Sequence, residues 1–246
     1  MADYTQSPAS AFLRQLVEAN NTYDYCKRKF KTSDGKLHEE AKENLELVTL
    51  SLVASAMGHF ETFQKSLFAG SVEVSRFFKD FHVEAFCNQL RNGYSIKPNN
   101  ILAFRGNSAQ VGSIIADHLG EWHNPATVSE YFKLFGNDFN FYSNKDIATL
   151  RFLWQVRHTI VHTGGWLTLP DAQKVKSLTD KGDRALAFED RFIYAMVKKL
   201  HNLVRSCVNR LDKETRKRLR PNITTVERDE FNEMMKVEST SPTFFR

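Results

Sequence analysis

The sequence predicts an all-α fold, a helical bundle with a long amphipathic C-terminal helix and an inserted small-helix region. Apolar residues recur at helical spacing along most of the 246 residues. Glycine, proline and asparagine fall between these apolar runs, where helices end. The sequence lacks the apolar–polar alternation that is typical of half-buried strands. We expect one domain over residues 1–220, followed by a short helix and a mobile tail over residues 221–246.

Three helices are expected in the first part of the chain. Ser7 and Pro8 are typical of an N-cap followed by the first helical residue. An SDG triplet separates the first helix from the second, and Gly70 is expected to end the second. Apolar residues occupy more than one face of the second helix, which indicates that it is buried among neighbours. The three expected helices span residues 7–30, 37–69 and 74–92.

Four further helices are expected after an irregular stretch at residues 93–107. Asn124 followed by Pro125 is typical of a helix start, and Gly136 of the end of that helix. Asn144 is expected to cap the next helix. The last of the four is expected to be the longest amphipathic helix of the chain. The four span residues 111–119, 125–135, 144–163 and 183–220.

Composition indicates an ordinary soluble protein. With 41% hydrophobic and 26% charged residues, the chain can bury a core. The three cysteines, Cys26, Cys87 and Cys207, are far apart and odd in number, which argues against a disulfide framework and suits a reducing compartment. No apolar run reaches the roughly 18 residues of a membrane span, and the N-terminus lacks the pattern of a secretory signal. We therefore expect a cytoplasmic location without membrane association.

Positive charge is concentrated in two segments, KRKFK at 27–31 and the stretch 210–220, and the net charge is +5. Such clusters favour binding to a polyanion such as RNA, because each phosphate contact by Lys or Arg releases counterions. A mildly basic, solvated surface is an equally good interpretation. The RNA-binding residues expected from the clusters are Lys27, Arg28, Lys29, Arg216 and Lys217.

Several kinds of site are disfavoured by the sequence. The glycines do not form a phosphate-binding loop between a strand and a helix, and no HExxH motif occurs. His118, Glu121 and His123 in HLGEWH are residue types that bind metals, but the two histidines lie across an expected helix end and need not converge. We expect neither a metal nor a cofactor.

The segment RHTIVH places an arginine and two histidines at the end of the expected helix 144–163. Arg157 lies on the apolar stripe of this helix, where an unpaired guanidinium is costly, so it needs an anionic partner or an open cleft. His158 and His162 are four positions apart and share one face. A glycine pair is expected to end the helix directly afterwards. A proton donor beside a fixed cation suits phosphodiester chemistry.

This segment resembles the catalytic motif of the HEPN superfamily, all-α domains many of which are RNases. The family motif is an arginine followed about four to six residues later by a histidine, often with Asn, Asp or His directly after the arginine. Arg157, His158 and His162 match it, and glycine follows as in many members. Upstream, NPATVSEYFKLFG, a short polar link and the motif helix resemble the standalone RNase-like branch of the superfamily. The resemblance covers about 41–210 and is strongest over 124–165.

The resemblance implies a metal-independent endoribonuclease that leaves a 2′,3′-cyclic phosphate by attack of the ribose 2′-OH. His162 would act as general base or acid, Arg157 would stabilise charge on the phosphate, and His158 would position or assist. Family habit implies a homodimer with a composite site. It also implies a setting in toxin or antiviral defence, with an antitoxin or a regulatory defence protein as a partner.

The sequence leaves open a structural role for Arg157 and a non-catalytic function for the protein. Spacing alone is weak evidence, since Arg76 and His82 also fit the looser pattern without a helix end nearby. Arg157 could instead be a core arginine in a buried ion pair, with Glu61 on the apolar stripe of the helix 37–69 as its partner and two surface histidines beside it. The other function considered is a non-catalytic HEPN-like module that binds a nucleotide or a protein partner.

Overall fold

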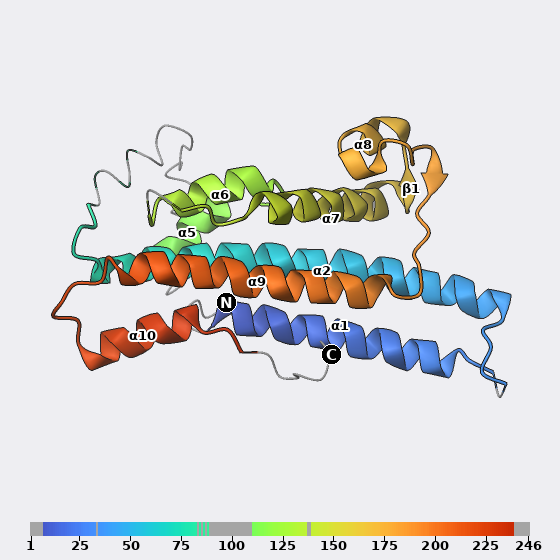
Figure 1. Cartoon of the computed structure of the whole chain (residues 1–246), viewed down its shortest axis with the longest axis horizontal. Coiled ribbons are helices and arrows are strands. Elements are labelled where there is room, and N and C mark those ends of the chain that lie inside the picture. The colour runs from blue at the N-terminus through green and yellow to red at the C-terminus, as the bar shows by residue number, and fades with distance from the viewer. Residues whose placement is uncertain are drawn as a thin grey trace. The chain divides into compact units, whose positions relative to one another are not determined.

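The computed structural model describes residues 7–32, 34–82, 84, 86, 88, 110–136 and 139–238. Helices dominate these residues, so the expected all-α class is confirmed. Among them, no helix combines the length and the apolar composition that a membrane crossing requires. The elements are α1 (Pro8–Lys29), α2 (Glu39–Val74), η1 (Ser75–Phe77), α5 (Val111–His118), α6 (Pro125–Lys133), α7 (Asn144–Thr163), β1 (Trp166–Leu167), α8 (Leu169–Gln173), η2 (Lys176–Leu178), β2 (Arg184–Ala185), α9 (Phe192–Arg216) and α10 (Thr225–Met235) (Figure 1).

The chain forms two compact units that interleave in sequence. Their boundary falls inside α1, α2 and α9, so these helices contribute residues to both. Helix α10 lies in the segment after residue 220, where a short helix is expected. Unit 1 consists of Met1–Ala11, Glu61–Ser143 and Val204–Glu238, and unit 2 of Phe12–Phe60, Asn144–Leu203 and Ser239–Arg246.

Unit 1 is organised around Phe68 of α2, which is fully buried. Four aromatic rings meet Phe68 edge-on at centroid distances from 5.4 to 6.2 Å, and they belong to Trp122, Tyr131, Phe132 and Phe135. Edge-on pairs of this kind each contribute about 0.5–1.5 kcal/mol beyond burial. They hold α6 and the segments on either side of it against the second half of α2.

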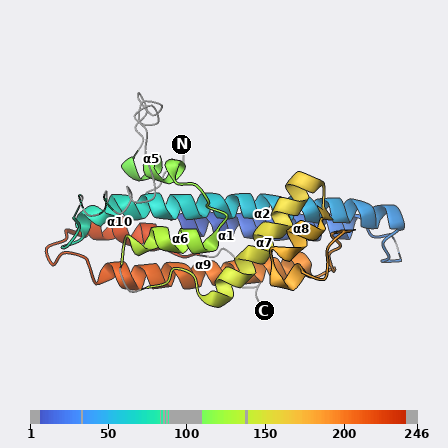
Figure 2. The same ribbon diagram turned by 90° about the horizontal axis from the view of Figure 1, so that it is seen from above.

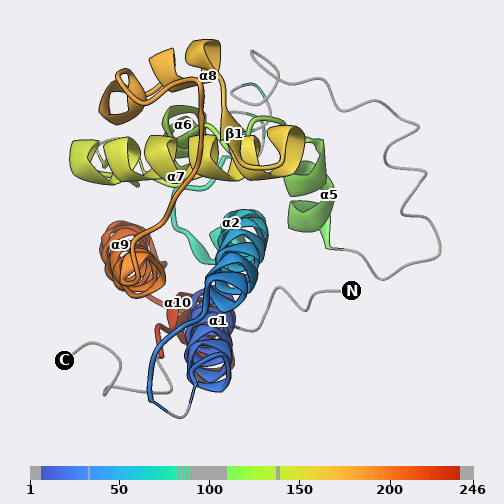
Figure 3. The same cartoon turned by 90° about the vertical axis from the view of Figure 1, so that its right-hand side faces the viewer.

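Unit 2 contains the helix that carries RHTIVH. In this unit α7 lies on one side of α2 and α9, and α1 lies on the other (Figure 1, Figure 3). Phe60 of α2 contacts Phe12 of α1 at a ring distance of 5.5 Å and Trp154 of α7 at 6.3 Å. A single buried side chain therefore joins three helices of the unit.

Polar contacts join α1 to the start of α9 within unit 2. The Tyr194 hydroxyl donates to the Asp24 carboxylate, and the Asn20 amide donates to the same carboxylate at 3.3 Å. Burial, followed by the bond to Asp24, raises the pKa of Tyr194 well above its ordinary value, so the phenol stays protonated. Lys27 forms an ion pair with Asp190 at 3.2 Å. One of the cations expected to bind RNA thus already has a carboxylate partner.

Most expected helix boundaries agree with the structure. Helix α1 begins at Pro8, α6 begins at Pro125 with Asn124 as its N-cap, and α7 spans Asn144–Thr163. The Asn124 side chain accepts from the Ala126 backbone N–H at 3.1 Å, which is the contact that makes Asn-Pro a start signal. The expected irregular stretch at 93–107 lies outside the described residues.

Two boundary predictions in the first half of the chain are wrong. Helix α2 does not end at Gly70 but continues to Val74. Gly70 is buried, and the burial of the surrounding turns outweighs the roughly 1 kcal/mol that a glycine costs inside a helix. The expected phenylalanine-rich helix does not begin at 74, because η1 occupies Ser75–Phe77 and Phe78 is extended.

The expected helix 183–220 is too long, because α9 begins only at Phe192. The residues before α9 form backbone hydrogen bonds with the chain near β1 instead of with a helix. The Asp183 N–H donates to Leu167 O at 2.7 Å, and the Leu186 N–H donates to Gly165 O at 2.8 Å. These bonds flank the short β1–β2 ladder. Each of its strands has only two residues, too few for an apolar–polar alternation to show in the sequence. Among the described residues α2 is longer, with 36 residues against 25 in α9, but α2 is buried on more than one face, and α9 is the long amphipathic helix that the sequence predicts.

Candidate functional site

The C-terminal half of α7 has a buried face and a solvent face. Leu153, Trp154 and Val156 are buried in the core. His158 has a side chain that is 44% exposed, and His162 is exposed one turn further on. The apolar residues therefore fix the helix against the unit and leave both imidazoles accessible from solvent.

The helix ends where the glycine pair predicts. Gly164 and Gly165 have φ angles of 61° and 93°, in the left-handed region that glycine adopts without strain. The Gly165 N–H donates to Thr159 O at 3.1 Å, and the Thr163 hydroxyl lies 2.6 Å from Trp166 O. These bonds turn the chain back along α7 into β1, so α8 and the hairpin lie at the end of α7 that carries the histidines (Figure 1, Figure 2).

The two imidazoles form a pair. Their ring centroids are 4.5 Å apart, and the ring planes are inclined at 41°. This proximity follows from the spacing of four residues, which places side chains one above the other on a helix. The sequence therefore predicts correctly that the two imidazoles share one face of the helix. At this distance, one imidazole can donate a proton to a small bound group while the other accepts a proton from it.

A carboxylate that the sequence analysis did not identify faces this pair. Asp171 of α8 is buried, and its Oδ1 lies 4.0 Å from His158 Nε2 and 2.6 Å from Lys174 Nζ. The Thr168 hydroxyl accepts from the Asp171 backbone N–H at 3.3 Å and caps α8. Thr168, Pro170 and Asp171 make a helix-start signature that could have located α8. Nothing in the sequence places that helix beside His158.

The electrostatics of the site favour a neutral His158. Burial is the main cause that lowers the pKa of His158, and the neighbouring charges on His162, Lys174 and Arg157 lower it further. Asp171 opposes them, because a carboxylate stabilises the imidazolium. The hydrogen bond from Lys174 is the main cause that lowers the pKa of Asp171, so this carboxylate is ionised at neutral pH.

We expect the pKa of His158 to respond in opposite directions to changes at its two neighbours. Asp171→Asn removes the charge that favours the imidazolium, so the pKa of His158 should fall further below its ordinary value. Lys174→Met removes a charge that disfavours the imidazolium, so the pKa should rise. Two-dimensional NMR titration of the histidine side chains measures both shifts, with exposed His59 on α2 as the internal reference. Shifts of the same sign in both variants would contradict this electrostatic account.

The same pKa shift predicts the sign of a stability change with pH. His158 titrates below its ordinary value of 6.5 in the folded chain and near that value when unfolded. Between these two values the unfolded chain binds more protons, so lowering the pH through this window decreases the free energy of unfolding.

Arg157 is half-buried, and its Nε is enclosed without a hydrogen-bond partner among the residues that the structure describes. Within the described part of unit 2 it forms no ion pair. Glu61 is 32% exposed and pairs with Lys65 at 2.9 Å one turn along α2, so it is less buried than the apolar stripe predicts. Glu61 belongs to unit 1 and Arg157 to unit 2, and their pairing stays a prediction.

The first basic segment does not lie beside the histidine pair. Lys27, Arg28 and Lys29 form the last turn of α1, and α2 and α9 lie between α1 and α7 (Figure 3). Lys27 is paired with Asp190, and Lys29 lies 5.7 Å from the centre of the Tyr25 ring. Their role in RNA binding stays a prediction. Because α2 and α9 lie between α1 and α7, these three residues do not form one surface with His162.

The second basic segment is largely neutralised within unit 1. Arg216 pairs with Asp212 at 2.8 Å and Lys217 with Glu214 at 2.7 Å. Two further pairs in the same segment join Arg218 to Asp80 and Arg220 to Glu227. The charge clustering seen in the sequence therefore overstates the positive potential of this helix end.

Exposed apolar side chains surround the end of α7. Val161, Trp166 and Leu169 are 50%, 48% and 55% exposed, on α7, β1 and α8. The Trp166 indole lies 3.4 Å from Asp183 Oδ1, which limits its rotation. Scattered exposed residues are common on protein surfaces. These three come from consecutive elements at the C-terminal end of α7.

The described residues contain no group of three or more His, Cys, Asp and Glu side chains suited to hold a metal ion. In HLGEWH, His118 Nδ1 lies 2.7 Å from Ile114 O, and the Glu121 carboxylate accepts from the Thr127 hydroxyl at 2.9 Å.

Comparisons with protein-family models, with curated proteins and with solved structures found no match.

Proposed function

We propose that this protein is a metal-independent endoribonuclease of the HEPN type, with its chemistry at the C-terminal end of α7. The observation that supports the proposal most directly is the imidazole pair, 4.5 Å apart, next to Arg157 and the Asp171 carboxylate. Cleavage at a ribose needs a base for the 2′-OH, an acid for the leaving 5′-oxygen and a cation for the phosphate. The four side chains supply each of these groups.

The charge distribution supports a division of labour between the histidines. His158 has a lowered pKa and an adjacent carboxylate, so it is neutral at neutral pH and suited to accept the 2′-OH proton. His162 is exposed in the last turn of α7, one turn beyond His158, where a leaving group can approach it from solvent. It is suited to donate a proton to the leaving oxygen. Arg157 would neutralise charge that grows on the non-bridging phosphate oxygens.

A homodimer with a composite site, a toxin or antiviral-defence role and an antitoxin or regulatory partner remain part of the proposal, by family resemblance. The exposed side chains of Val161, Trp166 and Leu169 support the dimer, because they offer apolar surface beside the histidine pair. Apposition of two α7 ends would bring two histidine pairs to one phosphodiester.

Cleavage of a single-stranded RNA oligonucleotide in excess EDTA tests the proposal. We expect products that carry a 2′,3′-cyclic phosphate and a 5′-OH, identified by mass spectrometry. The same oligonucleotide with 2′-deoxyribose at the cleaved positions should resist, since the attacking hydroxyl is absent. Cleavage of the deoxy substrate, or activity that EDTA abolishes, would contradict the proposed chemistry.

The second candidate is a non-catalytic HEPN-like module that binds a nucleotide or a protein partner. The neutralised charge of the segment 210–220 favours it, because a long RNA has fewer free cations to bind than the sequence predicts. Such a module would show saturable binding and no turnover under the conditions of the RNA assay.

A further inference from the structure

Unit 2 contains a cavity of about 520 Å³ that the proposed chemistry does not use. Its walls come from α7, β1, η2, β2 and the segment that leads into α9. Val156, Leu167 and Leu178 line it and are buried. Phe188 and Phe192 line it too, with ring centroids 4.4 Å apart. A concave, mainly apolar cavity of this size is typical of a small-molecule site.

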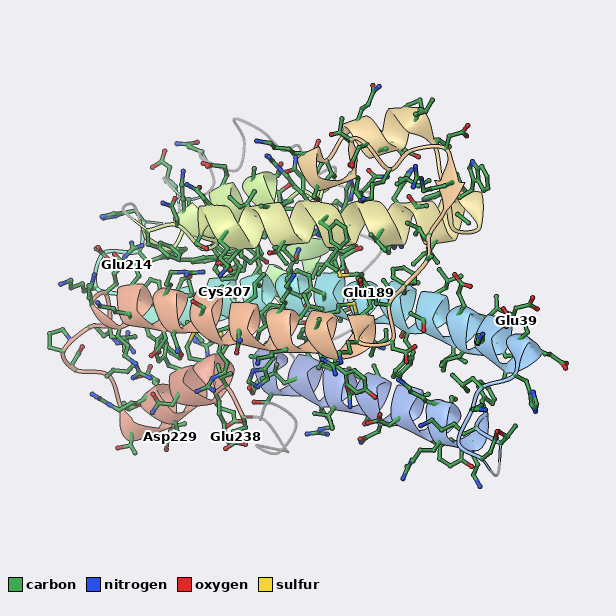
Figure 4. All side chains as sticks on the ribbon, turned by 45° about the vertical axis from the view of Figure 1, so that its right-hand side comes forward. Glu39, Glu189, Cys207, Glu214, Asp229 and Glu238 are labelled. Atoms are coloured by element: carbon green, nitrogen blue, oxygen red, sulfur yellow. The ribbon has the colours of Figure 1, made fainter. Side chains whose placement is uncertain are left out.

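The mouth of the cavity carries an excess of positive charge. The exposed residues of the cavity lining include Lys181, Arg184, Arg191 and one carboxylate, Glu189, and their exposure to solvent places them at the mouth. Figure 4 labels Glu189, which lies on the segment just before α9. Lys181 lies 3.8 Å from Asp180, whereas neither Arg184 nor Arg191 has an ion-pair partner in the described part of unit 2. Two guanidinium groups are therefore free to bind an anion at the edge of an apolar cavity.

We propose that this cavity binds a small amphiphile with an apolar body and one anionic head group, of the fatty-acid class. The apolar body lies against the phenylalanine and leucine side chains, where its transfer from water is favourable. The head group lies at the mouth and pairs with Arg184 and Arg191. A neutral apolar molecule lacks the ion pairs with the two arginines, and a fully polar anion lacks the burial of an apolar body.

The test uses octanoate and octan-1-ol as probes, because they share an alkyl chain and differ in charge. Titration of the isotope-labelled full chain, followed by NMR of the backbone amides, should show saturable shifts at residues 184–192 and at Phe152. We expect octanoate to bind more tightly than octan-1-ol by roughly two- to tenfold, the gain of exposed ion pairs. Equal affinities would overturn the anionic part of the proposal, and no saturable shift at these residues would overturn all of it.

Three variants separate charge from shape. Arg184→Gln combined with Arg191→Gln should remove the advantage of octanoate while leaving octan-1-ol binding unchanged, and Glu189→Gln should increase the advantage. Arg151→Gln is the matched control, since Arg151 is exposed on α7 and does not line the cavity. An octanoate advantage that survives the double arginine variant would overturn the assigned head-group site. The arginine variants lie on the surface and leave the apolar wall intact, so they are expected to fold.

Discussion

His162→Ala should leave a folded protein whose RNA cleavage rate is lower by about 10²–10⁴-fold, the usual contribution of a proton-transfer group. His162 is exposed, and its ring touches His158 rather than the core, so its removal creates no cavity. The rate under single-turnover conditions in EDTA gives the effect, and a thermal melt of the same sample reports folding.

The matched control for this prediction is His59→Ala. His59 is also an exposed histidine on a helix of unit 2, but it lies on α2 away from RHTIVH in sequence. The control variant should cleave RNA at the wild-type rate. A folded His162→Ala protein with wild-type cleavage would refute the catalytic role and leave the interpretation as surface histidines standing.

Arg157→Lys should reduce cleavage by about 10²-fold, because lysine keeps the charge but loses the planar fork that binds two phosphate oxygens. Arg157→Ala should reduce it by about 10²–10³-fold. Both variants should fold. Within the described part of unit 2, Arg157 has an unpartnered Nε and no ion pair, so its removal leaves no carboxylate there without a partner. Arg151→Lys, on the exposed face of the same helix, is the control and should behave as wild type.

The melting temperature of Arg157→Ala also tests whether Glu61 forms a buried ion pair with Arg157. If the two side chains form a buried pair, loss of the arginine should cost roughly 3–5 kcal/mol of stability. Glu61 is one-third exposed and already paired with Lys65, so we expect a much smaller change. A double-mutant cycle with Glu61→Gln measures the coupling directly. A large coupling energy would restore Glu61 as the partner of Arg157.

The sequence predicts the local part of the candidate site and not the part that depends on long-range contacts. The start and end of α7, its glycine stop and the shared face of His158 and His162 follow from periodicity and capping, which act over a few residues. The position of Asp171 depends on a hairpin of two-residue strands, too short for any periodic signal. Residues 183–186 show the same limit, since the sequence predicts a helix from residue 183 but the backbone bonds of these residues belong to the hairpin and its flanks.

The hairpin also joins the two ends of the segment that carries Asp171. Residues 168–182 connect β1 to β2. Their Ala172, Val175 and Leu178 form a small apolar cluster with Leu167, against which Phe152 and Leu186 pack. Because the two ends of this loop are already joined, altering its length changes the closure entropy only slightly. Evolution or an engineer can therefore exchange the carboxylate that faces His158 by replacing one loop, while the helices that position the imidazole pair keep their sequence.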